Sequence, residues 1–476
     1  MKKMTSNSYR KPILTGGALV LAATASVFAQ QKPFMQGGTA QPPAPLAAKP
    51  AAATPEAAKD ITTSTNVVEE LFNGKIPDAL ANGKVNVNVR ARYEQANEEG
   101  VPAVTKNSYA PTIRTRVGFT TAPLYGFQAM VEGVNVSAIG PEHNYNAAGS
   151  NGQGARPAVA DPTLTRLDQA WAGFTYTNWV SAKVGLQQIN LDNQRFIGDS
   201  GWRQNMQTFE AAGIGSEPLP DLKLYYAYVW DVHRVYGNVD DLPAANRDFD
   251  SDSHLINVSY SGWKYGRFVG YAYLLDLSNA AGDANSSATY GGYFAGAAPL
   301  NDKISVDYRA EYAFQTDYGK SPLNYSANYY NAEAGLNVKP VAFGAGYEDL
   351  GSGANTGAAG GRAAFRAPLS TLHAFNGWDD MFLNTPNDGL QDYYGYLQVT
   401  LPAQIPVRFV FHKFNAEHGG GDYGEEYDVV VSKKFGKYWT ALVKYAYYNG
   451  NDPAAPALTA SHVDVQRFWA QVEFNF

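Results

Sequence analysis

From residue 84 to the end of the chain, apolar and polar residues alternate in runs about as long as one β-strand. In the last run, "VQRFWAQVEFNF", alternate side chains of an extended strand fall on opposite faces. The apolar face carries Phe468, Ala470, Val472, Phe474 and Phe476. The polar face carries Arg467, Gln471, Glu473 and Asn475. This pattern fits either the last strand of a soluble sandwich or a strand between lipid and a watery lumen.

The connections between the runs separate these two architectures. Short connections, such as "NW" at 178, "EPL" at 217 and "KP" at 339, alternate with long ones such as 138–163 and 351–389. Outer-membrane barrels have tight periplasmic turns and long external loops, whereas a soluble sandwich has no reason for this asymmetry. We therefore predict an all-β fold over residues 84–476. It is a transmembrane antiparallel β-barrel of about 18 strands, with its last strand paired to its first.

The chain before residue 84 has the features of export and connecting segments. Basic residues precede an apolar run that ends near "VFA", which predicts a secretory signal peptide over residues 1–29. A single anchor helix is the alternative, but the run is short and weak for a membrane span. Residues 30–62 are rich in Ala and Pro and predict a periplasmic linker, and residues 63–83 predict a short helix. The chain contains no cysteine, so no disulfide framework stabilises the exported protein.

Composition excludes several classes of protein. The net charge of −7 argues against a nucleic-acid partner. Beyond the signal segment no apolar run is long enough for a transmembrane helix, and the mean hydropathy is −0.32. A barrel remains compatible with this value because lumen-facing polar residues dilute its hydrophobicity. The 32 tyrosines fit the aromatic girdles of such barrels, whose partners are outer-membrane lipid and lipopolysaccharide.

Strand phase predicts which charged residues face the lumen. A charged side chain on the lipid face costs about 2 to 4 kcal/mol at the midplane, so charges belong inside. The basic residues placed inside are Arg90, Arg92, Arg114, Arg116, Arg166, Lys183, Lys223, Arg309, Arg408, Lys444 and Arg467. Interleaved acids, placed inside by the same phase, include Glu94, Asp168, Glu210, Glu311 and Glu473. The arginines on the first two strands and the last strand would form a positive lane, unless the acids pair with them and only stiffen the wall.

A second predicted site is the loop "NLDNQRFIGDSGWRQN", which is too polar for lipid yet contains aromatic and aliphatic residues. If this loop folds inward, it narrows the pore and brings Arg195 and Arg203 near the constriction. The alternative is an external loop with a small core of its own. The acidic stretch "NVDDLPAANRDFDSD" lacks regular calcium-ligand spacing, which favours solvation over a metal site.

Two longer stretches resemble a known family. "VGLQQINLDNQRFIGDSGWRQNMQTFEA" followed by "LYYAYVWDVHRVYG", and later "FRAPLSTLHAFNGWDDMFLNTPNDGLQDYYGYL", are similar to alginate-export outer-membrane porins. The resemblance implies an eighteen-stranded barrel with a charged lumen, and an anionic uronic-acid polymer as the family's namesake cargo. It also implies that barrel-assembly machinery recognises the terminal phenylalanine.

These observations predict a channel in the outer membrane of a Gram-negative-type bacterium. Its cargo would be a hydrophilic, anionic solute or polysaccharide that passes passively, and the alternative is a general diffusion porin with weak selectivity. An outer-membrane hydrolase or an adhesin are the other classes considered. The chain contains neither G-x-S-x-G nor H-E-x-x-H, so we expect no enzyme activity, cofactor or metal.

Overall fold

The structure is a computed structural model that describes residues 70–476, except residues 178, 238–241, 244–245, 280 and 451–459. The predicted signal peptide and linker, and residues 63–69 of the predicted helix, lie outside the described residues. A π-helical turn, η1 (Leu71–Lys75), leads into α2 (Ile76–Ala81) ahead of the first strand. The backbone N–H of Ala122 donates to the carbonyl oxygen of Ala79 at 2.9 Å and holds α2 against a barrel turn. Among the described residues, no helix has the length and apolar character needed to span a membrane.

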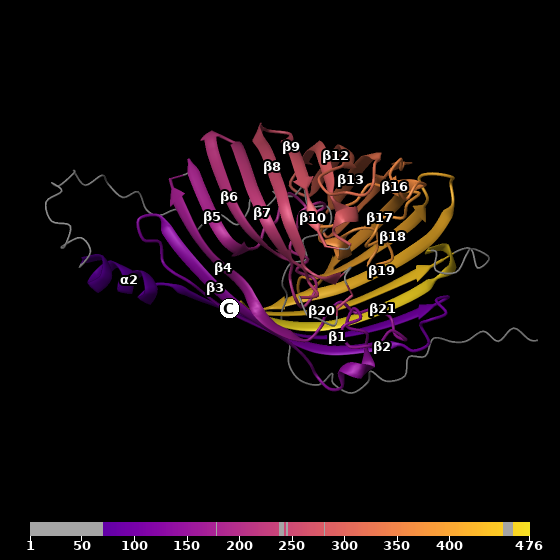
Figure 1. Cartoon of the computed structure of the whole chain (residues 1–476), viewed down its shortest axis with the longest axis horizontal. Helices are drawn as coiled ribbons and strands as arrows, with labels where there is room; N and C mark the ends of the chain where they lie inside the picture. Colours follow the sequence, from indigo (N-terminus) through magenta and orange to yellow (C-terminus); the bar gives the residue numbers. More distant parts are fainter. Residues whose placement is uncertain (1–69, 178, 238–241, 244–245, 280, 451–459) are drawn as a thin grey trace, which may run out of the picture.

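Eighteen antiparallel strands form one closed wall, as the alternating pattern predicts (Figure 1). Each strand pairs with its neighbours in chain order, and the last strand closes the wall by pairing with the first, with Glu473 opposite Arg90. The wall strands are β1 (Lys84–Glu99), β2 (Ser108–Thr120), β3 (Phe127–Ala138), β4 (Leu164–Tyr176), β5 (Val180–Gln187), β6 (Thr208–Leu219), β7 (Leu222–His233), β8 (Phe249–Trp263), β9 (Gly266–Leu275), β11 (Ser287–Pro299), β12 (Ile304–Asp317), β13 (Ser326–Val338), β14 (Val341–Leu350), β17 (Leu390–Leu401), β18 (Ile405–Asn415), β19 (Asp422–Phe435), β20 (Trp439–Asn449) and β21 (Asp464–Asn475).

Short turns and both ends of the barrel chain lie at one edge, and the long connections lie at the other. The long connections carry small elements of their own: β10 (Leu277–Ser278), the hairpin β15 (Ser352–Ala354) with β16 (Arg362–Ala364), η2 (Glu142–Asn144), η4 (Asp283–Asn285), η5 (Leu372–Ala374) and η6 (Ala460–His462). One predicted turn is wrong in position. "EPL" at 217 belongs to β6, because the pairing of β6 with β7 slips between Ser216 and Leu219 and so accommodates Pro218. The turn follows at residues 220–221.

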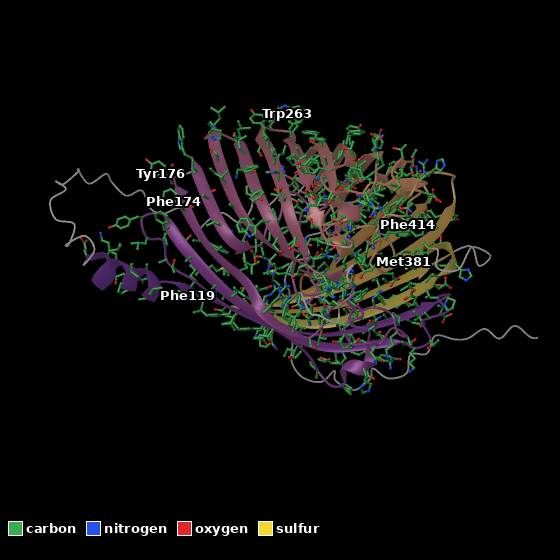
Figure 2. All side chains as sticks on the ribbon, in the orientation of Figure 1. Phe119, Phe174, Tyr176, Trp263, Met381 and Phe414 are labelled. Carbon is green, nitrogen blue, oxygen red and sulfur yellow. The ribbon has the colours of Figure 1, made fainter. Side chains whose placement is uncertain are left out.

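The outer face of the wall is apolar and strongly aromatic. Near the short-turn edge, Trp263 packs on Phe268 and Phe294, with ring centroids 5.5 and 5.2 Å apart. Figure 2 shows Tyr176 and Trp263 projecting from this edge. Tyrosines such as Tyr312 and Tyr330, with centroids 5.2 Å apart, face outward nearer the other edge. Two aromatic levels separated by apolar wall are the surface that a barrel presents to a bilayer.

The largest cluster of buried hydrophobic residues lies inside the barrel, between the wall and inward-folded loops. Phe196, from the connection between β5 and β6, packs against Tyr271 and Tyr329 of the wall at 5.4 and 5.2 Å between ring centroids. The ring of Phe365, from the connection between β14 and β17, lies 5.7 Å from the Phe196 ring between centroids. The lumen is therefore partly filled by the chain itself, and the loops that fill it define the candidate site.

Candidate pore constriction

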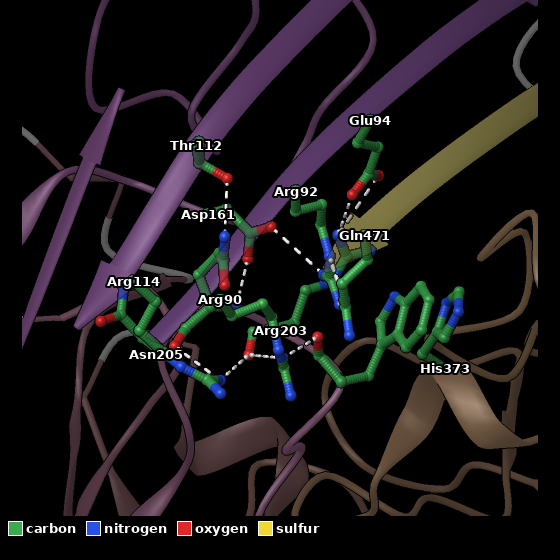
Figure 3. Close-up of polar contacts among 12 residues, drawn as sticks. Arg90, Arg92, Glu94, Thr112, Arg114, Asp161, Arg203, Asn205, His373 and Gln471 are labelled. Atoms are coloured by element: carbon green, nitrogen blue, oxygen red, sulfur yellow. Dashed lines mark hydrogen bonds and ion pairs between the residues drawn. The ribbon is translucent and has the colours of Figure 1, made fainter. Parts of the chain in front are cut away.

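The segment 188–207, which joins β5 to β6, crosses the lumen beside the first two strands. The Nη1 group of Arg90 donates to the carbonyl oxygens of Gly201 and Trp202 at 3.1 and 3.0 Å. The Nη1 group of Arg114 donates to the carbonyl oxygen of Gln204 at 3.4 Å. Figure 3 shows these arginines converging on the segment. The wall arginines thus act as anchors for an inward loop.

A second segment, residues 365–389 of the connection between β14 and β17, lies against the first. The backbone N–H of Gly198 donates to the carbonyl oxygen of Leu369 at 2.8 Å, and that of Thr371 donates to the carbonyl oxygen of Gln194 at 3.1 Å. A Cβ on Gly198 would lie 2.3 Å from the Thr371 hydroxyl, so glycine permits this close approach. We refer to residues 188–207 and 365–389 together as the inner loops.

A third connection, between β3 and β4, supplies an acid to the same region. The carboxylate of Asp161 lies 3.5 Å from the Arg92 guanidinium and accepts the backbone N–H of Gln204 at 2.7 Å. Arg467 donates to the carbonyl oxygen of Ala158 in this connection at 3.0 Å. Three connections therefore meet at the wall formed by β21, β1 and β2 (Figure 3).

The predicted arginine lane faces inward, and acids pair with each of its members. Glu473 binds Arg90 and Arg114 at 3.2 and 2.9 Å. The remaining pairs are Arg92 with Asp161 at 3.5 Å, Arg116 with Asp168 at 2.9 Å, and Arg467 with Glu94 at 3.3 Å. Strand phase places three of these acids, Glu473, Glu94 and Asp168, inside the barrel. Asp161 is not among them, because it lies in a loop where strand phase gives no information.

The loop arginines of the predicted site lie on opposite sides of the inner loops. Arg203 binds Glu94 of β1 at 3.2 Å and also pairs with Asp380 of the second inner loop. Arg195 binds Glu348 of β14 at 2.7 Å. The Asn376 amide oxygen accepts from Arg195 at 3.0 Å, so each loop arginine contacts both the wall and the second inner loop.

Of the other predicted basic residues, Lys183, Arg309 and Arg408 lie apart from this cluster. Arg166 contacts it, because its Nη2 group lies 3.4 Å from Asp168, the partner of Arg116, and donates to the Met206 carbonyl oxygen in the first inner loop. Arg166 donates to the Arg234 carbonyl oxygen at 2.9 Å, and Lys183 lies 4.6 Å from the ring centroid of Trp171. Arg309 stacks on Tyr293 at 3.8 Å and pairs with Glu311. Arg408 stacks on Tyr396 at 4.1 Å, and its Nη1 group has no hydrogen-bond partner among the described residues.

One acid was placed on the wrong face by strand phase. Phe209 and Ala211 on either side of Glu210 are both buried inside, and Glu210 itself binds Trp230 Nε1 at 2.8 Å with a half-exposed carboxylate. The register of β6 against β7 slips between Glu210 and Ala211. A bulge of this kind reverses the phase locally, which simple alternation does not reveal.

The wall opposite the arginines pairs tyrosines with carboxylates, and this pairing was not predicted from strand phase. Tyr271 donates to Glu311 at 2.8 Å, and Tyr329 donates to Glu348 at 2.6 Å. Asp192 of the first inner loop accepts from Tyr293 at 2.8 Å. The same period-two argument that placed the arginines inside also places these tyrosines inside. The signal was therefore present in runs such as "YAYLLD".

Lys444 of β20 occupies an aromatic cage between the inner loops and the wall. Its Nζ lies 4.4 Å from the ring centroid of Trp202, 3.7 Å from that of Trp378 and 5.2 Å from that of Trp469. It also lies 2.7 Å from Nε2 of His373. No carboxylate of the described chain comes within 4.0 Å of this ammonium group. The rings and the imidazole are therefore its immediate partners.

The hydrogen bonds around His373 define its tautomer. Nδ1 donates to Asp380 at 2.7 Å, so Nε2 carries the lone pair that accepts from Lys444. Burial, followed by the charge of Lys444, holds the pKa of His373 well below its usual range. Burial alone would raise the pKa of Asp380, but His373 and Arg203 outweigh it and lower the pKa below its usual range. The loop thus carries a neutral imidazole and an ionised carboxylate side by side.

No family model and no curated protein matches the sequence. The fold is similar to that of solved outer-membrane proteins. Pseudomonas aeruginosa OpdK, solved with vanillate, has a TM-score of 0.62 at 11% identity, over 83% of this chain and 99% of that chain. P. aeruginosa OccK9 (OpdG) has a TM-score of 0.61 at 12% identity, over 84% and 100% of the two chains. Acinetobacter baumannii OccAB2 has a TM-score of 0.61 at 15% identity, over 84% and 99%.

At these identities the likeness establishes the fold alone. The eighteen-stranded barrel is of the outer-membrane type, which places the chain in the outer membrane of a Gram-negative-type bacterium. The resemblance to the alginate-export family stays a prediction, as do the transported solute and the role of each arginine.

Proposed function

We propose that the protein is an outer-membrane channel through which a hydrophilic anion passes passively. The observation that carries the proposal is the row of inward arginines on β21, β1 and β2, at the level where the inner loops narrow the lumen. Arginine stays ionised at any relevant pH, and its planar donors suit carboxylates and phosphates. Nε of Arg90 and Nε of Arg114 have no hydrogen-bond partner among the described residues, but both atoms are buried under the first inner loop, so in the docked state these arginines would act on a passing anion through their positive charge and not by direct contact.

A small anion fits the narrowed lumen better than a polysaccharide does. A polymer needs a continuous open path, whereas the inner loops fill part of the interior. One similar structure, OpdK, was solved with vanillate, a small carboxylate. An alginate-like polymer remains the cargo that the sequence resemblance suggests, and it would require the inner loops to move. A general diffusion porin is the alternative, and the paired acids of the arginine lane are the observation that favours weak selectivity.

The test is planar-bilayer recording on purified protein in a salt gradient, with small carboxylates and a polyuronate as blockers. The variant Arg92→Glu with Arg116→Glu should shift the reversal potential toward cations and weaken block by anions. The matched variant Arg92→Gln with Arg116→Gln removes the same ion pairs without reversing charge, and its shift should be smaller. A folded double-glutamate barrel with the wild-type reversal potential and the wild-type block would refute anion guidance. A wild-type protein without conductance would refute both channel functions.

A further inference from the structure

The two inner loops and the wall share one cationic contact. The Lys444 cage consists of Trp202 from the first inner loop, Trp378 from the second, and Trp469 from β21. These rings come from three segments that are far apart in the sequence, and all three lie around this ammonium group. Lys444 and Trp469 are almost completely buried, with 1% and 0% of their surface exposed.

The geometry around the cage ties the loops to each other as well as to the wall. Trp202 stacks on His373 of the second inner loop, with centroids 4.5 Å apart and planes 7° from parallel. The centroid of the Trp202 ring lies 4.2 Å from the Arg92 guanidinium carbon. It also lies 5.7 Å from the centroid of Trp469, with the two rings edge-on. An ammonium group with no carboxylate within 4.0 Å takes its direct compensation from the ring faces and the imidazole. Moving either loop away would therefore remove part of that compensation.

We propose that Lys444 is a latch that, in addition to the wall arginines, holds both inner loops in the lumen, and that its release widens the pore. The proposal rests on the proposed channel function, because it names the residue that sets the size of the constriction. In this role Lys444 positions the loops and does not itself bind the solute. The latch is specific for the docked state, because Trp202 and Trp378 surround the Lys444 ammonium group only when both inner loops are docked.

Amide hydrogen exchange tests the latch without assuming that the protein conducts. In Lys444→Met, amides of residues 194–207 and 365–380 should exchange at least about tenfold faster than in the wild type, because a desolvated cation–π site is lost. Trp378→Leu, which changes only a loop side chain, should act in the same direction. The double variant should be no worse than the more severe single variant, since both changes break one contact. Lys444→Arg should restore most of the protection because arginine also binds ring faces.

The matched control is Lys433→Met on the adjacent strand β19. Lys433 also lies near an aromatic ring, 5.4 Å from Phe435, but close to the short turn and away from the inner loops. Exchange of the inner loops in this variant should equal that of the wild type. Heat-modifiable migration on a gel establishes that each barrel is folded. Wild-type protection of both loops in folded Lys444→Met, or equal loss in Lys433→Met, would overturn the latch.

Single-channel recording then tests the effect on the pore. Lys444→Met and Trp378→Leu should show at least a twofold rise in open conductance or in the frequency of larger openings. Faster loop exchange with unchanged currents would overturn the claim that the latch sets the pore size. If the wild-type protein passes no current, the proposed function fails, while the exchange data still decide whether the latch exists.

Discussion

Replacing Arg203 with methionine removes an ion-pair partner from both the wall and the second inner loop. Arg203 binds Glu94 of β1 at 3.2 Å and also pairs with Asp380, and both carboxylates are buried. Breaking a buried pair by removing one partner costs about 3 to 5 kcal/mol. Glu94 keeps Arg467 at 3.3 Å, and Asp380 keeps His373 at 2.7 Å, so each acid retains one partner. We therefore expect the lower end of the range, about 3 kcal/mol.

This loss falls on the docked state of the inner loops, because the wall strands keep their own hydrogen bonds. A change of about 3 kcal/mol corresponds to about a hundredfold shift in the docking equilibrium. Amides held only when the loops are docked should exchange faster by that factor. Suitable probes are the Gln204 amide, which donates to Asp161 at 2.7 Å, and the Gly198 amide, which donates to Leu369 at 2.8 Å.

Two controls separate this effect from a general loss of charge. Arg203→Lys keeps the charge but loses the planar fork, so its exchange should lie between wild type and Arg203→Met. Arg362→Met removes a half-buried arginine of β16 that lies 3.8 Å from Asp388, and it should leave the probe amides unchanged. Probe exchange in Arg203→Met within about threefold of the wild type would refute the reasoning, since it corresponds to less than about 1 kcal/mol.

Three further predictions concern assembly, topology and pH. Deleting Phe476, whose backbone N–H donates to Val87 at 2.9 Å, should lower the amount of inserted barrel, whereas barrels that do insert should conduct normally; wild-type levels would contradict its closing role. Protease added to intact cells should cut within the exposed residues 356–361 and spare the turn at Lys339 and Pro340; cutting confined to the short turns would invert the topology. Burial and Lys444 lower the pKa of His373, and Asp380 and Arg203 also face its ring. The docked loop therefore favours the neutral imidazole, so the stabilisation that His373 gives to docking is complete above about pH 6.5 and declines as the pH falls. Loop exchange, corrected for intrinsic rates, should thus rise between pH 7.5 and pH 5 in the wild type, and an equal rise in His373→Gln would count against this assignment.

The barrel and the inward direction of its arginines follow from the sequence because both depend on local alternation. A strand between lipid and a lumen must place Arg90 and Arg92 on the face opposite Val89 and Ala91, and the structure has this arrangement. The asymmetry between short turns and long loops also predicts which end of each hairpin faces the periplasm. These signals extend over a few residues at a time, so a reader of the sequence can find them without knowing what lies across the lumen.

The partners of the charged residues do not follow from the sequence. Asp161 and Asp380 reach their arginines from long connections, whose paths depend on contacts with the whole interior. The Lys444 cage is a further example, because its three tryptophans share no spacing or motif. Bulges add a local source of error, since the slip beside Glu210 reverses the faces that alternation assigns.

The pairing of β21 with β1 has a consequence for the order of events in barrel assembly. Glu473, the fourth residue from the end of the chain, contacts Arg90 and Arg114, which lie 383 and 359 residues earlier. Contacts of such long separation form late, because most of the chain must be placed before they can be made. The same two arginines hold the carbonyl groups of the first inner loop. Glu473 reaches these arginines only when β21 pairs with β1, so the ion pairs that support the anchors of the first inner loop are completed together with the closed wall.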